Sequence, residues 1–121
     1  MNAKNAELLT RDIKLLALWQ RHKDCFARAD RLVEKQPRIE DSGDEQALAT
    51  LSARQSRALG DVHEVARQIA ETPASTFAGL VIKLRIAAVG LSPEYPRDSE
   101  TDELNLMAAL ADAERLAGDV I

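Results

Sequence analysis

The sequence has few aromatic residues: they make up 3% of its 121 residues, against 45% for all hydrophobic types. Its core must therefore consist mainly of Leu, Ala, Ile and Val, which favours closely packed helices over a sheet or an aromatic ligand cage. A single cysteine, Cys25, excludes an internal disulfide and favours a reducing compartment. No apolar run reaches the ~18 residues of a membrane span, and Glu7, Arg11 and Asp12 interrupt any stretch resembling a signal peptide. We therefore expect one cytoplasmic domain over residues 1–121.

Two long stretches carry an apolar pattern close to a heptad repeat. The first advances from Leu8 to Val33 in steps of four and three, and the second advances from Leu48 to Ile69 in steps of three and four. A period near 3.5 keeps one stripe of a helix facing its partner over many turns. Because only segment 37–43 separates them, the pattern predicts a long antiparallel hairpin that turns near residue 40. Its core should pair Trp19 and Phe26 with Leu51, Gln55, Ala58 and Leu59.

Capping residues predict where the helices begin and end. The first helix should begin at Asn2 or Asn5 and end near Gln36, because Pro37 disfavours helical geometry in the residue before it. Ser42 and Glu45 match a capping box for the second helix, which should end near Glu71. A third helix should cover about 74–90, with Thr72 as its cap, Pro73 at its first position and Ser75 as the rival cap. A fourth should cover about 100–118. These elements predict an all-α, four-helix, bundle-like domain.

The two shorter helices differ in their apolar patterns. The third is apolar on nearly every side, with Lys83 and Arg85 as its charges, so we expect it to be buried or to meet another subunit. Gly79 costs ~1 kcal/mol relative to Ala, which suggests that another backbone passes close by. The last helix has an apolar stripe, which Gly118 ends: Leu104, Met107, Leu110, Ala111 and Ala117.

Residues 71–80, Glu-Thr-Pro-Ala-Ser-Thr-Phe-Ala-Gly-Leu, are followed by Lys83. This segment resembles a Pro-Ala-Thr-Thr-Leu-Ala-Gly-Leu motif in small helical proteins of alphaproteobacteria, often of prophage or mobile-element type. It departs from that pattern at Ser75 and Phe77. The resemblance implies a helical layout of the whole chain and a mobile-element setting, but no activity. In physical terms the motif is explained by a cap, a helix start and a close helix crossing.

Candidate metal and catalytic residues are few. His22 and Cys25 lie three residues apart and could supply two ligands to zinc. A turn near residue 40 would place His22 and His63 about five residues out of register, roughly 7 Å along the axis, which is too far to share a metal. Asp61 and Glu64 flank His63, but neighbouring helical residues point apart. We expect no metal, no cofactor and no enzymatic activity.

Basic residues recur every seven positions along the first helix: Lys14, Arg21, Arg28 and Lys35. Residues 1–38 hold nine Lys/Arg and five Asp/Glu, a charge of +4, whereas 39–72 and 73–121 each carry −4. Spaced positive charge can follow a phosphate backbone, and Arg31 and Arg38 lie close to the row. However, Asp24 and Glu34 dilute it, and no interleaved aromatics could stack on bases. We expect a solvated face, with nucleic-acid binding as the alternative.

The apolar residues outnumber those that one hairpin seam needs. The surplus would suit a symmetric dimer or the docking of a different protein. We therefore predict a non-enzymatic protein–protein interaction module, an adaptor or small regulator, that forms a homodimer. The alternative is a nucleic-acid-associated accessory protein that uses the basic row. The residues expected at the interface are Leu9, Leu16, Leu18, Ile82 and Ile86.

Overall fold

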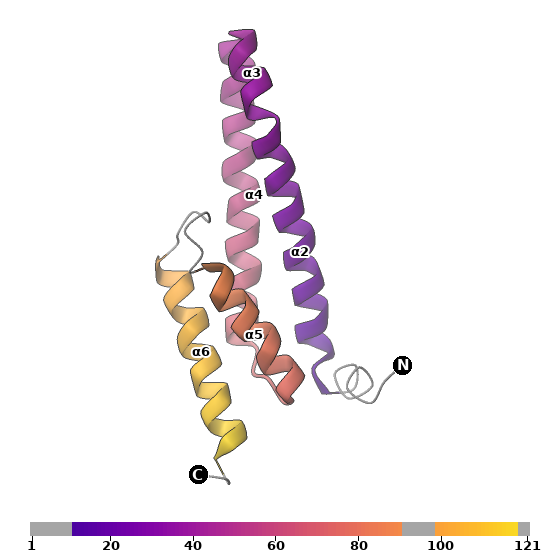
Figure 1. Ribbon diagram of the computed structural model, residues 1–121, viewed down its shortest axis with the longest axis vertical. Coiled ribbons are helices and arrows are strands. Elements are labelled where there is room, and N and C mark those ends of the chain that lie inside the picture. The colour runs from indigo at the N-terminus through magenta and orange to yellow at the C-terminus, as the bar shows by residue number, and fades with distance from the viewer. Residues whose placement is uncertain (1–10, 91–98, 119–121) are drawn as a thin grey trace.

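The computed structural model describes residues 11–90 and 99–118, and their regular structure is entirely helical. Two long helices, α2 and α4, lie side by side as a hairpin; α3 lies at its tip, and α5 and α6 pack against the other half, the base (Figure 1). None of these helices is both long and apolar enough to cross a membrane. The all-α, bundle-like prediction is confirmed. The helices are α2 (Ile13–Glu34), α3 (Gln36–Ser42), α4 (Glu45–Glu71), α5 (Phe77–Gly90) and α6 (Ser99–Ala117).

The turn of the hairpin comes later than expected. Segment 37–43 was predicted to be a linker, but most of it lies in α3, which ends at Gly43 in a left-handed conformation (φ 70°). The predicted capping box is wrong, because the Ser42 hydroxyl donates to the Ile39 carbonyl (2.6 Å). Asp44 caps α4 instead, and its carboxylate accepts from the Ala47 N–H at 3.0 Å.

The later turn shifts the register between α2 and α4. Arg28 forms an ion pair with Asp61, whereas a turn near residue 40 would have placed it opposite about residue 52. The Gln55 amide donates to Gln36 (3.1 Å), and its distance of 3.5 Å from the Leu32 carbonyl agrees with the same register. The predicted pairing of Trp19 and Phe26 with residues 51–59 is therefore wrong by about nine positions.

Phe26 is also not enclosed in the contact between α2 and α4. Its side chain is 38% exposed, and Val33, the last residue of the predicted stripe, is 57% exposed. A straight helix rotates a strict heptad stripe by about 20° per repeat, so the stripe turns away from the partner helix along α2. His22 remains buried, at 5% exposure, and Cys25 is half-buried against the core.

The main core lies at the base of the hairpin, where α5 and α6 cover α2 and α4. The tip has no such cover, and between the start of α4 and Val62 the buried hydrophobic residues of that helix are Leu51 and Ala58. This division leaves the outer half of the hairpin as a two-helix rod. The core cluster consists of Leu15, Leu18, Val65, Ala66, Ile69, Ala74, Leu80, Ile82, Ile86 and Ala109.

Predicted helix ends agree with the structure for α4, which stops at Glu71, and to within one residue for α6. The prediction for α5 is wrong at its start, because the helix begins at Phe77 rather than near residue 74, so neither Thr72 nor Ser75 caps it. The predicted start of the first helix, at Asn2 or Asn5, lies outside the described residues.

Candidate interaction surface

The segment before α5 is held by a carboxylate from a distant part of the chain. Asp12, just before α2, is 3% exposed and accepts hydrogen bonds from the Ser75 N–H (2.8 Å) and the Thr76 N–H (2.9 Å). It also accepts from the Thr76 hydroxyl (2.6 Å). The same hydroxyl accepts from the Gly79 N–H (3.1 Å), so Thr76 is the N-cap of α5. Asp12 thus fixes where α5 begins and how it meets α2.

Gly79 is required by this contact. A methyl group at its Cα would overlap the Asp12 carboxylate, with the carboxylate carbon only 2.8 Å away, and would lie 3.3 Å from the Ala74 side chain. A close approach at Gly79 was predicted, but the approaching group is a side chain rather than a backbone. Glycine destabilises a helix, but here its missing side chain leaves the space that the Asp12 carboxylate occupies.

A buried ion pair holds the other side of the same segment. The Lys83 ammonium is 2.5 Å from Asp112 and donates to the carbonyls of Thr72 (2.9 Å) and Ala70 (3.2 Å) at the end of α4. Asp112 also accepts from the Ala74 N–H (3.1 Å) and from Arg115 (2.9 Å). Burial raises the pKa of Asp112, but these hydrogen bonds outweigh it and hold the pKa below its usual value.

This ion pair determines which face of α6 points inward. The buried positions of α6 are Thr101, Asn105, Ala109 and Asp112, three of which are polar. The leucines and the methionine of the apolar stripe are exposed instead: Leu104 is 40%, Met107 55% and Leu110 49% exposed. The apolar stripe of α6 faces away from the core.

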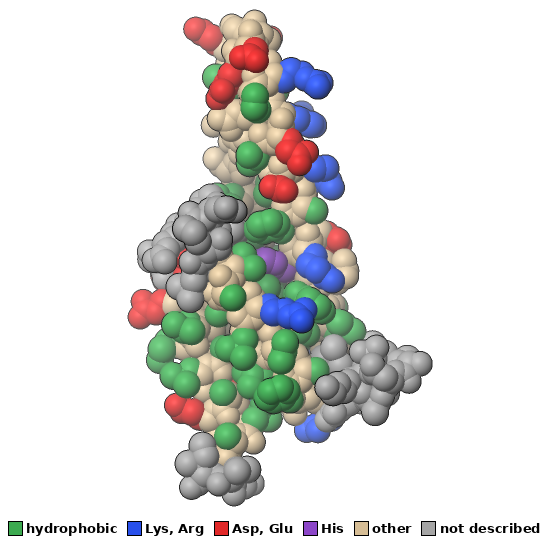
Figure 2. All heavy atoms as spheres, viewed as in Figure 1, with side chains coloured by type: hydrophobic (Ala, Val, Ile, Leu, Met, Phe, Trp, Pro, Cys, Tyr) green, Lys and Arg blue, Asp and Glu red, His purple; other side chains and the backbone are tan. Residues whose placement is uncertain are grey.

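Exposed apolar side chains gather over α5 and α6, and hydrophobic groups dominate this face in Figure 2. Phe77, the first residue of α5, is the most exposed of them at 76%, and Leu84 of the same helix is 46% exposed. None of these exposed residues belongs to the core cluster of the described chain. We call the following set the α5–α6 apolar surface: Phe77, Leu84, Leu104, Leu106, Met107 and Leu110.

The interface residues predicted from the sequence are not part of the α5–α6 apolar surface. Leu18, Ile82 and Ile86 are each at most 8% exposed and belong to the chain's own core. Leu16 is half-buried and packs against that core, and Leu9 lies outside the described residues. The apolar side chains expected at the interface therefore belong to the core or pack against it where they are described. The exposed apolar side chains lie on the outer faces of α5 and α6 instead. The sequence held one clue to this arrangement. Among the apolar residues of α6 lies Asp112, an acidic residue that could pair with Lys83 and so turn the apolar side chains outward.

The basic row of α2 is partly neutralised by α4. Arg28 is paired with Asp61. Hydrogen bonds from Arg67 and Gln68 lower the pKa of the Glu64 carboxyl group, and the charge of nearby Arg21 makes a smaller contribution in the same direction. Lys14 and Lys35 have no ion-pair partner among the described residues. The row is therefore not a continuous strip of free charge.

His22 is buried, and His63 lies near enough to act on it electrostatically. Burial lowers the pKa of His22, and the nearby His63 lowers it further. The His22 ring stacks on Phe26, with ring centroids 6.3 Å apart. No group of three or more His, Cys, Asp or Glu side chains within residues 11–90 and 99–118 could hold a metal ion. Asp61 and Glu64, the carboxylates beside His63, already bind Arg28 and Arg67.

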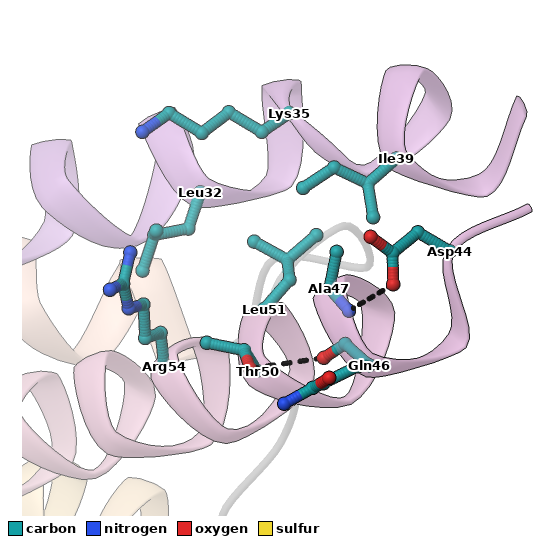
Figure 3. Close-up of a pocket in the computed structure, with 9 residues that line it drawn as sticks. All are labelled: Leu32, Lys35, Ile39, Asp44, Gln46, Ala47, Thr50, Leu51 and Arg54. Atoms are coloured by element: carbon teal, nitrogen blue, oxygen red, sulfur yellow. Dashed lines mark hydrogen bonds between the residues drawn. The ribbon is translucent and has the colours of Figure 1, made fainter. Parts of the chain in front are cut away.

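A groove of about 480 Å³ lies at the tip, between the end of α2 with α3 and the start of α4 (Figure 3). Leu32 and Ile39 from one side and Leu51 from the other form its floor, with Ala47 beside them. Lys35 and Arg54 approach the groove from opposite sides at the Leu32 end, and Asp44 lies at the Ile39 end. The remaining lining residues are Gln46 and Thr50.

Comparison of the chain with protein-family models, curated proteins and solved structures found no match. The resemblance of segment 71–83 to the alphaproteobacterial motif stays a prediction. Its shared positions have physical roles here: Ala74 is fully buried, Thr76 caps α5, Gly79 admits Asp12, and Lys83 pairs with Asp112.

Proposed function

We propose that this protein is a non-enzymatic interaction module, an adaptor or small regulator, that binds another protein through the α5–α6 apolar surface. One observation carries the proposal: α6 turns Thr101, Asn105 and Asp112 inward, with Asp112 paired to Lys83, and presents leucines and a methionine to solvent. Apolar side chains gathered on a surface are typical of binding sites. The proposal includes a cytoplasmic location, which the single Cys25 favours.

The size of this surface suits a protein contact. Taking ~150 Å² for each fully exposed side chain, the low end of the range for an aromatic residue, the exposed fractions of the six residues amount to roughly 450 Å². Interfaces are about 60% apolar, so this area is the apolar share of a contact of roughly 750 Å². A stable protein–protein contact buries about 800 Å² on each partner. The surface is therefore large enough for a specific complex.

We propose a second copy of the chain as the partner. A surface that lies along two antiparallel helices can meet its own copy about a two-fold axis, so that four helices pack across the contact. Met107 and Leu110 lie near the middle of the exposed face of α6 and would be buried at the centre of this contact.

The test measures molar mass by light scattering at tens of micromolar protein. We expect about twice the 13.3 kDa chain mass for the natural protein and the monomer mass for Met107→Lys and Leu110→Glu. Val33→Glu is the matched control, because Val33 is 57% exposed but lies on α2, outside this surface. A monomeric natural protein would contradict the homodimer, and a dimer that persists in both α6 variants would show that the two copies meet at another surface.

A second experiment separates a homodimer from another partner. A photo-crosslinking residue replaces Met107 in cells of the native host, with the same residue at position 33 as the control. An adduct of twice the chain mass supports the homodimer, and an adduct of another mass shows a different partner at this surface. If position 107 gives no more adduct than position 33, the proposal that this surface binds a protein is wrong.

A further inference from the structure

The groove at the tip combines an apolar floor with positive charge. On its floor, Leu51 is 4% exposed, and Leu32 and Ile39 are half-buried. Lys35, at the junction of α2 and α3, and Arg54 of α4 extend toward the same end of the groove (Figure 3). Such a groove can hold aliphatic side chains along its length and an anionic group at one end.

The charge at this end is uncompensated. Within residues 11–90 and 99–118, Arg28, Arg67, Lys83 and Arg115 form ion pairs, whereas Lys35 and Arg54 form none. The acidic lining residue, Asp44, lies at the other end and is engaged with the Ala47 N–H. Elsewhere on the tip, exposed arginines (Arg31, Arg38 and Arg57) and exposed carboxylates (Asp30, Glu34, Glu40, Asp41 and Glu45) also have no ion-pair partner in the described part of the chain, so the positive charge is local to the Leu32 end of the groove.

We infer that the hairpin tip binds an acidic amphipathic helix of a partner protein, with aliphatic side chains on the groove floor and carboxylates beside Lys35 and Arg54. The groove extends along α4 from Asp44 to Arg54, about 15 Å at 1.5 Å per residue, which matches about three turns of a bound helix. A helix laid against two others completes a three-helix packing unit where the hairpin has no cover. Laying an apolar helix face into a groove is a recurrent mode of recognition.

The lining favours a helix over nucleic acid. A phosphate backbone would use the cations but leave the leucine and isoleucine floor in water, and none of the lining residues is aromatic and able to stack on a base. The groove is also separate from the α5–α6 apolar surface, so this inference goes beyond the proposed function.

The experiment follows the fluorescence anisotropy of a labelled synthetic peptide titrated with the full chain. The probe is an amphipathic peptide of about 14 residues with leucine every three or four positions and glutamate beside them. A second peptide has glutamine in place of glutamate, and a third has lysine. We expect saturable binding of the glutamate peptide with a Kd of tens of micromolar, at least fivefold weaker binding of the glutamine peptide, and weaker binding as salt is raised.

Matched variants assign the binding to the groove. Lys35→Glu and Arg54→Glu should each weaken binding of the glutamate peptide at least fivefold, whereas Lys14→Glu, the same change at an exposed lysine near the start of α2, should not. The double variant Lys35→Glu/Arg54→Glu should prefer the lysine peptide. Because these positions are exposed, circular dichroism should report unchanged folding.

Three outcomes would overturn the inference. These are the absence of saturable binding below about 1 mM, an equal effect of Lys14→Glu, and displacement of the peptide by a DNA duplex that binds more tightly to the same residues. The last result would show that the cations bind phosphate. Leu110→Glu should keep full peptide affinity, so failure here is distinguishable from failure of the dimer.

Discussion

Replacing Lys83 with Met tests the ion pair that orients α6. Methionine nearly preserves the side-chain volume but removes the charge, so Asp112 loses its partner and the Ala70 and Thr72 carbonyls lose a donor. Removing one member of a buried pair costs ~3–5 kcal/mol. The free energy of unfolding of a natural domain is ~5–15 kcal/mol, so the change should remove a large part of it. At about 4 °C per kcal/mol, we expect the melting temperature to fall by roughly 12–20 °C.

Urea denaturation and thermal melts followed by circular dichroism measure this effect. Arg67→Met is the control: Arg67 pairs with Glu64 and Glu71 on the surface of α4, where a salt bridge contributes ~0–1 kcal/mol. The lowered pKa of Asp112 adds a pH signature. Its contribution to stability is present above the unfolded pKa of about 3.9 and is lost as pH falls through the lower folded pKa. If Lys83→Met and Arg67→Met have equally small effects, the pair does not hold α6 in place.

Three further predictions concern the base and the seam. Gly79→Ala should cost at least ~1 kcal/mol despite its gain in helix propensity, and the same change in an Asp12→Ala background should cost nothing, as chemical denaturation of the four proteins would show. Phe26→Ala should cost ~1–2 kcal/mol rather than the ~3–5 kcal/mol of a fully buried Phe, and a larger loss in the same assay would mean that the ring is buried. Because the pKa of His22 is lowered in the folded state, stability should be constant above about pH 6.5 and fall as pH drops toward the folded pKa; His22→Gln should flatten this dependence in melts between pH 5 and 8.

The sequence was sufficient for the helical class and for the hairpin, because apolar periodicity and a short connection leave few alternatives. It was not sufficient for the register between the two long helices. That register depends on whether segment 37–43 is coil or helix, and Pro37 suits the first turn of α3 as well as it suits the end of a helix. An error of a few residues at the turn was enough to misplace every predicted contact of Trp19 and Phe26.

The candidate surface could not be predicted for a different reason. Periodicity assumes that apolar faces point inward, and for α6 this assumption failed because Lys83 needs a buried acceptor and Asp112 supplies it. A lysine in a mostly apolar helix was visible in the sequence, but its partner, 29 residues away, was not. Likewise, Gly79 indicated a close approach without identifying Asp12 as the group that approaches.

The separation of the core at the base from the nearly coreless tip has a consequence for how the sequence can change. Substitutions at the base disturb the packing around Leu15, Ile69 and Ile86 and threaten the fold as a whole. Most side chains of the tip are exposed, so exchanging them alters its charge and shape at little cost in stability. Related chains could therefore diverge in what the tip recognises while the base remains recognisably the same.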